Sequence, residues 1–376
     1  MRRNITRHSP NRGFSIVELL IALALGLLVV AGIVQLFVGN NRTYEVVNAQ
    51  ARLQENARFA FDFITRSARS AGYFGCAPET ANVALNLVGN WNLIPEYNMP
   101  EPVDGWESNG NGTFSPDDLA TMPRSGSADV NVHLAGNGID RDELSDTSDI
   151  LVFRSIEKPA ARLAQILQPN GIPIAYTPDG EPSFEVDDVL VLADCEQAAV
   201  FKVTDVATAG DETTLSRVVS GTAGPFENSA TVTTSTGDVI ASTLSVLGRS
   251  YGASATIAPL ETTFYFIAQS TELAQVAQSG IAGVAVNALW QKTGNNAPVE
   301  LVQGIENMQV LFGVDTTADD VLNVNQYLTI DNVEDVTEIV AVQVTLVVSS
   351  VDALAETGNQ KLQRTFTKTI HVRNMG

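Results

Sequence analysis

The sequence predicts an α+β protein in which one long N-terminal helix packs on a large, elaborated antiparallel β-sheet domain. Three observations support this fold class. An apolar run long enough to span a membrane occupies residues 13–38. A helical repeat of apolar residues continues to about residue 70. Strand-length runs separated by turn residues then fill most of 149–374.

The chain begins with a basic segment ahead of the apolar run. Residues 1–13 contain four arginines and no lysine or acidic residue. The 25 residues Phe14–Val38 exceed the ~7–15 apolar residues of a secretory signal, and no A-x-A-like cleavage site follows before residue 42. A single-pass anchor with its N-terminus in the cytoplasm fits this pattern better than a discarded signal peptide.

Glu18 is the one charged residue inside the apolar run. A carboxylate within a membrane span costs at least ~2.5 kcal/mol on insertion scales. Such a residue persists where a partner or a function offsets that cost. A plain anchor explains the length of the run and its arginine flank, but it leaves Glu18 without a role.

The segment GFSIVE at residues 13–18 resembles the class III signal of type IV pilins and pseudopilins. The resemblance implies that a prepilin peptidase cuts between Gly13 and Phe14 and methylates the new N-terminus at Phe14. Glu18 would then be the fifth residue of the mature chain. In lipid, its carboxylate would pair with the cationic amine of Phe14 on a neighbouring subunit.

The helical pattern continues beyond the apolar run, because no proline occurs between Pro10 and Pro78. Apolar residues recur at steps of three and four, at Val46, Ala49, Leu53, Ala57, Phe61, Ile64 and Ala68. We therefore expect one helix from residue 15 to about residue 70, ~80 Å long at 1.5 Å per residue. The alternative is an amphipathic juxtamembrane coil that pairs with nothing.

The predicted domain organisation has three parts. Residues 1–13 form the leader. Residues 14–75 form the long N-terminal helix, with 14–38 as its transmembrane part. Residues 76–376 form a β-rich globular domain outside the membrane, which we expect to be a single sheet domain.

Residues 77–148 differ from the rest of this domain in being dense in Gly, Asn, Pro and Asp. This composition predicts a loop-rich insertion. Two of the three tryptophans, Trp91 and Trp106, lie there. They either anchor a partner in an interface or fix the loop to its own domain, and the second interpretation is favoured.

Charge divides the chain near residue 76. Residues 1–76 carry nine arginines and four acidic residues, whereas the remaining 300 carry 13 Lys/Arg and 39 Asp/Glu. An acidic head of this kind argues against nucleic-acid binding through phosphates, which needs clustered basic residues. It also argues against contact with anionic lipid headgroups.

Cys76 and Cys195 are the only two cysteines. Beyond a span oriented by cytoplasmic arginines, both would lie in an oxidising periplasm, where such a pair is expected to form a disulfide. On the chain-entropy model, the bridge would contribute up to ~4–5 kcal/mol to stability. A catalytic or metal role for either thiol is disfavoured, because no C-x-x-C motif or nearby histidine is present.

From residue 149 onward the sequence predicts strands. The runs are 149–155, 188–194, 199–206, 213–219, 262–268, 300–315, 338–350 and 364–374. The clearest alternation puts Val340, Val342, Val344, Leu346 and Val348 on one apolar face.

The stretches 51–76, 300–315, 340–350 and 363–374 are together similar to PilW-type minor pilins. The resemblance implies a structural assembly subunit rather than an enzyme, and type IV pilus assembly within a priming or tip complex of minor pilins. It implies contacts with other minor pilins and the major pilin through the N-terminal helix, with the prepilin peptidase, and with a tip adhesin. The chain would lie in the inner membrane before assembly and then in the pilus at the cell surface.

Three alternatives stay open. A minor pseudopilin of a type II secretion system would have the same N-terminus. An adhesin or ligand-binding head on a pilin stalk would use the 77–148 segment. A membrane-anchored periplasmic enzyme would depend on His133.

The sequence contains few features that would indicate catalysis or cofactor binding, and no cofactor or metal site is predicted. None of the common hydrolase, P-loop or dinucleotide motifs occurs. His371 fits a solvent-facing strand position. The acidic stretches at 140–149 and at Asp315, Asp319 and Asp320 lack the EF-hand spacing for Ca²⁺, so solvated turns are favoured.

Overall fold

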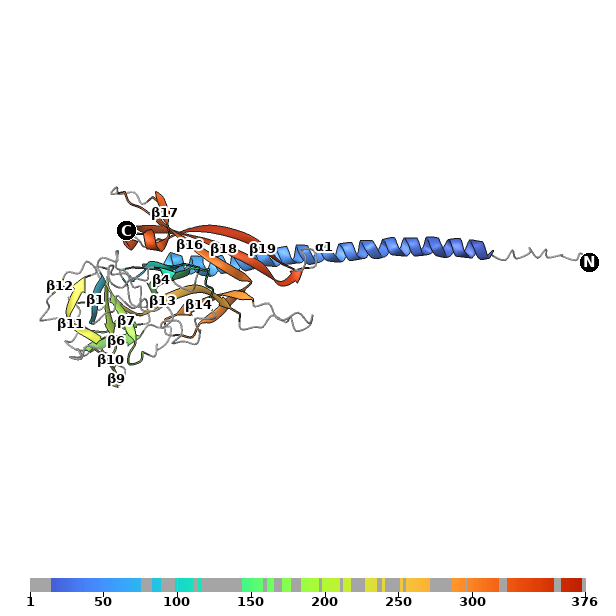
Figure 1. Ribbon diagram of the computed structural model, residues 1–376. Coiled ribbons are helices and arrows are strands. Elements are labelled where there is room, and N and C mark those ends of the chain that lie inside the picture. The colour runs from blue at the N-terminus through green and yellow to red at the C-terminus, as the bar shows by residue number, and fades with distance from the viewer. Residues whose placement is uncertain are drawn as a thin grey trace, which may run out of the picture.

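The computed structural model has one long helix that projects from a β-rich head (Figure 1). The structure describes residues 15–75, 83–88, 99, 101–110, 114–115, 144–157, 161–165, 171–176, 184–195, 198–209, 212–217, 227–234, 239–240, 251–252, 255–270, 286–294, 296–317, 323–354 and 360–373. The predicted α+β fold, a long apolar helix packed on a large antiparallel sheet domain, is confirmed.

Helix α1 runs from Ile16 to Ser70, 55 residues in all. It begins where the Ser15 hydroxyl accepts a hydrogen bond from the amide of Val17 at 3.3 Å, which caps the first turn. It ends before Gly72, whose φ of 76° favours glycine. The amide of Gly72 donates to the carbonyl of Arg154 at 3.0 Å, so the end of the helix is fixed to the sheet.

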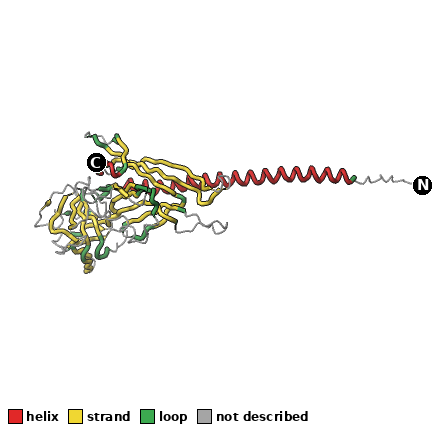
Figure 2. The backbone as a smooth tube through the Cα atoms, in the orientation of Figure 1, coloured by secondary structure: helices red, strands yellow, loops and turns green. Residues whose placement is uncertain are grey.

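The head contains two sheets, and their strands can be followed in Figures 1 and 2. The large sheet is built from β1 (Val83–Val88), β2 (Val103–Ser108), β3 (Phe114–Ser115), β4 (Ile150–Ile156), β5 (Ala161–Leu163), β6 (Gly171–Tyr176), β7 (Val189–Ala193), β8 (Ala198–Lys202), β9 (Asp205–Ala209), β10 (Glu212–Ser216), β11 (Glu227–Thr234), β12 (Val239–Ile240), β13 (Thr256–Gln269), β14 (Asn287–Thr293) and β15 (Val299–Gln303). The C-terminal sheet has the order β17-β16-β18-β19, from β16 (Ile305–Val314), β17 (Gln326–Leu328), β18 (Ile339–Leu354) and β19 (Gln360–His371). Two short 3₁₀ helices, η6 (Ile330–Asn332) and η7 (Val336–Glu338), precede β18.

The second half of α1 lies between these two sheets. Its buried side chains share one core with residues of both sheets, among them Phe153 and Ile267 on one side and Val344 and Leu346 on the other. The helix residues in this core include Leu53, Ala57, Phe61, Ile64 and Ala68. The predicted apolar face of the helix is thus buried from residue 53 onward, and Val46 and Ala49 are half-buried. The predicted apolar face of β18 is also buried, from Val340 to Val348.

Strand β13 connects the part of the head around α1 with a second, distal lobe, which comprises β5–β10 and the first residues of β13. The start of β13 pairs with β5 and β7, whereas its second half pairs with β4 and β14. The distal lobe has its own core, which includes Leu163, Ile174, Leu192, Phe201 and Leu215. In Figure 1 it lies at the end of the head away from the N-terminus, next to β1 and β11. Within the described residues the head thus has two sheets and four clusters of buried apolar residues, and the single sheet domain stays a prediction.

Most of 77–148, the segment predicted to be a loop-rich insertion, lies outside the described residues, so that expectation stays a prediction. Three strands, β1, β2 and β3, lie in this segment, and β2 pairs in register with β4. Gly105 permits this pairing, because a Cβ there would lie 2.6 Å from the carbonyl oxygen of Ile150. Trp106 is 3 % exposed and stacks on Phe264 with ring centroids 6.4 Å apart, so it fixes the segment to its own domain. Trp91 lies outside the described residues.

Arg154 on β4 forms a buried ion pair with Asp104 on β2. The guanidinium Nη2 lies 3.1 Å from Asp104 Oδ2, and the two side chains are 0 % and 3 % exposed. Arg154 also donates to the carbonyl of Glu101. A charge removed from water in this way destabilises the fold strongly if its partner is lost.

We predict that Asp104→Asn lowers the free energy of unfolding by about 3–5 kcal/mol, because it removes the carboxylate that pairs with the buried guanidinium of Arg154. Asp187→Asn is the matched control: Asp187 pairs with Lys202 at 2.7 Å but is 75 % exposed, so its loss should cost less than about 1 kcal/mol. Urea unfolding of the detergent-solubilised protein measures both. Equal effects of the two substitutions would contradict the argument.

Glu107, Asp149 and Asp331 form an acidic cluster where the two sheets meet. Asp149 accepts hydrogen bonds from the amides of Ser108 at 3.0 Å and Val310 at 2.8 Å, which joins β2 to β16. Burial, together with the charges of Asp149 and Asp331, raises the pKa of Glu107 to about 7. Burial likewise raises the pKa of Asp149 to about 6.

Because both pKa values are higher in the folded state than the ordinary carboxyl values, the folded protein binds protons more tightly than the unfolded chain. The resulting stabilisation is complete below the unfolded pKa values and is lost as the pH rises through about 6–7. We therefore expect Glu107→Gln to raise the urea midpoint relative to wild type more at pH 8 than at pH 5. A difference between the two proteins that does not change with pH would exclude the cluster as its source.

Candidate assembly interface

The first half of α1 presents apolar side chains on every side. Residues 15–44 are all exposed in the structure, and Ile16, Leu28 and Phe37 are each more than 70 % exposed. By length and composition this helix could cross a membrane: an 18-residue window has a mean hydropathy of 2.8, and none of that window is buried. A surface of this kind requires either lipid or other apolar helices around it.

Glu18 lies in the first turn of α1, at the start of this apolar surface. The unpaired amides of a first helical turn carry a partial positive charge, which favours a carboxylate there by about 0.3–1 kcal/mol. This is less than the cost of placing a charge in lipid, so a cation from elsewhere is still needed. Gly13 and Phe14, the predicted cleavage and N-methylation residues, lie outside the described residues.

Polar contacts fix the second half of α1 to both sheets. Tyr265 on β13 donates to the carbonyl of Phe63 at 3.1 Å and lies 2.8 Å from the Ser67 hydroxyl. Burial raises the pKa of Tyr265 to about 12, so the phenol keeps the proton it donates. On the other side, Lys368 of β19 donates to the Thr65 hydroxyl at 2.9 Å. These contacts hold the second half of the helix in place and so set the direction in which its apolar half leaves the head.

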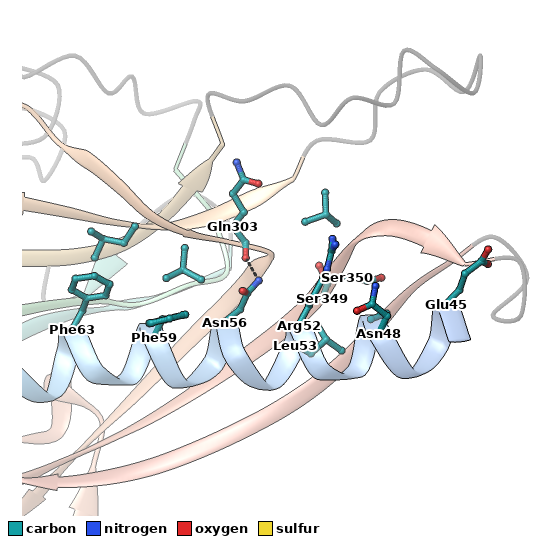
Figure 3. Close-up of a pocket in the computed structure, with 14 residues that line it drawn as sticks. Glu45, Asn48, Arg52, Leu53, Asn56, Phe59, Phe63, Gln303, Ser349 and Ser350 are labelled. Atoms are coloured by element: carbon teal, nitrogen blue, oxygen red, sulfur yellow. Dashed lines mark hydrogen bonds between the residues drawn. The ribbon is translucent and has the colours of Figure 1, made fainter. Parts of the chain in front are cut away.

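A groove of about 710 Å³ opens beside α1 at the point where the helix leaves the head (Figure 3). Helix residues form its floor, and the end of β15 and residues 349–351 of β18 form its walls. Asn56 donates to the carbonyl of Gln303 at 3.0 Å and so connects the floor to one wall. Sequence reasoning missed this groove. The only available signal was the polar series Asn48, Arg52 and Asn56, which lies at steps of four along a helix expected to be packed.

Only one of the two cysteines of the predicted disulfide lies within the described residues. Cys195 is disulfide-bonded, whereas Cys76 lies outside the described residues. Their pairing therefore stays a prediction. The neighbouring backbone is compatible with it, because a Cβ at Gly75 would lie 3.0 Å from the Cβ of Ala193.

Those of the other candidate side chains that the structure describes form no common site. His8, His133, Asp319 and Asp320 lie outside the described residues. His371 is an exposed strand residue, as expected. The Asp315 carboxylate accepts hydrogen bonds from Thr317 and Asn323, which lower its pKa and identify it as part of a turn. Within the described ranges, no three His, Cys, Asp or Glu residues are placed to hold a metal ion.

Two family models match the chain. Residues 8–34 match the prokaryotic N-terminal methylation motif. Residues 264–374, which include the second half of β13 and the strands from β14 to β19, match type IV pilus-assembly protein W. No curated protein and no solved structure matches the chain. The first match covers the start of the apolar helix and the second covers the C-terminal strands, and together the two matches support a type IV pilus minor pilin.

Proposed function

We propose that this minor pilin belongs to a priming complex of minor pilins that starts pilus assembly and remains at the tip. The observation that carries the proposal is the rigid connection between α1 and a matched C-terminal sheet, which makes the apolar helix an assembly element of the head. The size of the head also supports a tip position. A domain of about 300 residues is hard to accommodate in every turn of a closely packed shaft.

The assembly pathway follows from the N-terminal features. The chain enters the inner membrane once, with its arginine-rich leader in the cytoplasm. A prepilin peptidase removes residues 1–13 and methylates Phe14. The first half of α1 then moves from lipid into a bundle of other pilin helices, and Glu18 pairs with the amine of a neighbouring subunit. The head, bridged by Cys76 and Cys195, remains on the periplasmic and later the extracellular side.

The comparisons favour some alternatives over others. The matched description is of pilus assembly, which favours a pilus over a type II secretion system. The matched family is one of structural assembly proteins, which argues against the membrane-anchored enzyme. An adhesive or ligand-binding role for the distal lobe is the second candidate, because that lobe lies outside the matched residues and far from the membrane helix.

The proposed function is tested by mass spectrometry of pili sheared from cells. We expect this chain at a small fraction of the major pilin, beginning at N-methylated Phe14. Gly13→Val should block cleavage, so the chain should keep its 13-residue leader and be absent from sheared pili. A mature wild-type chain that is missing from pili, or as abundant as the major pilin, would overturn the tip assignment.

Glu18→Ala tests the electrostatic contact. Cleavage should be normal, because the cleavage site is unchanged, but co-purification with partner pilins should fall by about tenfold, equivalent to about 1.4 kcal/mol. Glu55→Ala is the control, since Glu55 is an exposed carboxylate on the same helix within the head. Unchanged recovery of partners with Glu18→Ala would show that the carboxylate is not an assembly contact.

A further inference from the structure

The groove beside α1 is lined mainly by uncharged side chains, although the head is strongly acidic. Asn48, Asn56, Ser349 and Ser350 supply amides and hydroxyls, and Phe59, Phe63 and Leu301 supply apolar surface. Of the lining residues that the structure describes, only Glu45 and Arg52 are charged. A surface that has few charged residues and several exposed aromatic side chains is typical of the core of a protein interface. Phe59 is 43 % exposed and Val299, on the adjacent strand, is 58 % exposed.

The walls of the groove are strand ends from two different sheets. Among the described strands, β15 pairs only with β14, so it forms an edge of the large sheet. The chain then crosses to the C-terminal sheet at Gly304, whose φ is 80°. A Cβ at Gly304 would lie 2.5 Å from the carbonyl oxygen of Ser349, so glycine is needed where the two walls meet. The groove is therefore a defined feature of how the two sheets hold α1.

The helix residues that line the groove follow the spacing of a helix-packing seam. Residues 45, 49, 52, 56, 59 and 63 recur at alternating steps of four and three, the repeat with which one helix packs along another. The same spacing runs back through Arg42 to Val38, at the end of the apolar half of α1, which is 41 % exposed. The groove face is thus continuous with the membrane-type surface of the helix.

Position along the helix limits what can occupy the groove. Glu45 lies seven residues beyond Val38, the predicted end of the span, which is about 10 Å at 1.5 Å per residue. The groove therefore opens just outside the membrane. Both of its walls lie within residues 264–374, the segment matched by the pilus-assembly model, and none of its lining residues lies in the distal lobe.

We propose that this groove receives the helix of a neighbouring pilin subunit, at the segment directly outside that subunit's membrane span. This inference rests on the proposed function and specifies its partner surface. The two helices would lie side by side from the membrane into the groove. The partner would place an apolar side chain against Phe59, Phe63 and Leu301, and polar side chains against Asn48 and Asn56.

Two alanines on the same helix provide a matched test. Ala49 lines the groove, whereas Ala51 is exposed on another face of α1. Ala49→Trp fills the groove and should lower the recovery of partner pilins from detergent extracts by about tenfold or more. Ala51→Trp should leave recovery at the wild-type level. Both variants should be cleaved normally and should keep the wild-type urea midpoint.

Photo-crosslinking tests the same surface without filling it. Benzoylphenylalanine at position 48, in the groove, should crosslink in cells to another pilin, with the linked peptide directly following that protein's membrane span. The same group at position 51 should not give this product. A crosslink to lipid, to a small molecule or to a second copy of this chain would overturn the proposal.

The outcomes separate this inference from the proposed function. If the wild-type chain recovers no pilin at all, the assembly role itself fails. In the other case, the wild type recovers pilins, Ala49→Trp recovers as many, and position 48 gives no crosslink to a pilin helix. The assembly role then stands, and the groove is not the docking surface.

Discussion

The packing of α1 between two sheets is the contact on which the rest of the head depends. Six helix residues, from Leu53 to Ala68, and the C-cap residue Ala71 share one core with strands of both sheets. Each large apolar side chain buried there contributes about 1.5–3 kcal/mol, and the helix covers an inner face of each sheet that would otherwise meet water. The N-terminal segment is therefore an integral part of the head's core as well as a membrane anchor, and the head is not expected to keep this arrangement without it.

One helix thus faces two environments, and the sequence changes where they meet. From residue 16 to residue 38 the helix is apolar on all sides and exposed, which suits lipid or a bundle of like helices. The polar segment 39–42 follows, and beyond it apolar residues recur at steps of three and four on the face that the head buries from Leu53 onward. Glu18 stands out because it breaks the first pattern, at the end of the helix where the amides of the first turn favour a negative charge.

The elements with a strong local pattern were predictable from the sequence. The buried face of α1 and the alternation from Val340 to Val348 follow from residue spacing alone, because each depends on one element and one apolar face. The strand at 103–108 was not predictable, since VDGWES has the composition of a turn and becomes a strand through its pairing with β4. The buried charges of Arg154 and Lys292 and the groove at Gly304 depend on pairing between distant segments, for which one sequence carries no signal.

Strand β13 has a mechanical consequence. Its 14 residues run without interruption from the distal lobe into the sheet that packs on α1. Tension applied to the distal lobe along this strand would load the backbone hydrogen bonds of β13 in shear, many at once, rather than opening them one after another.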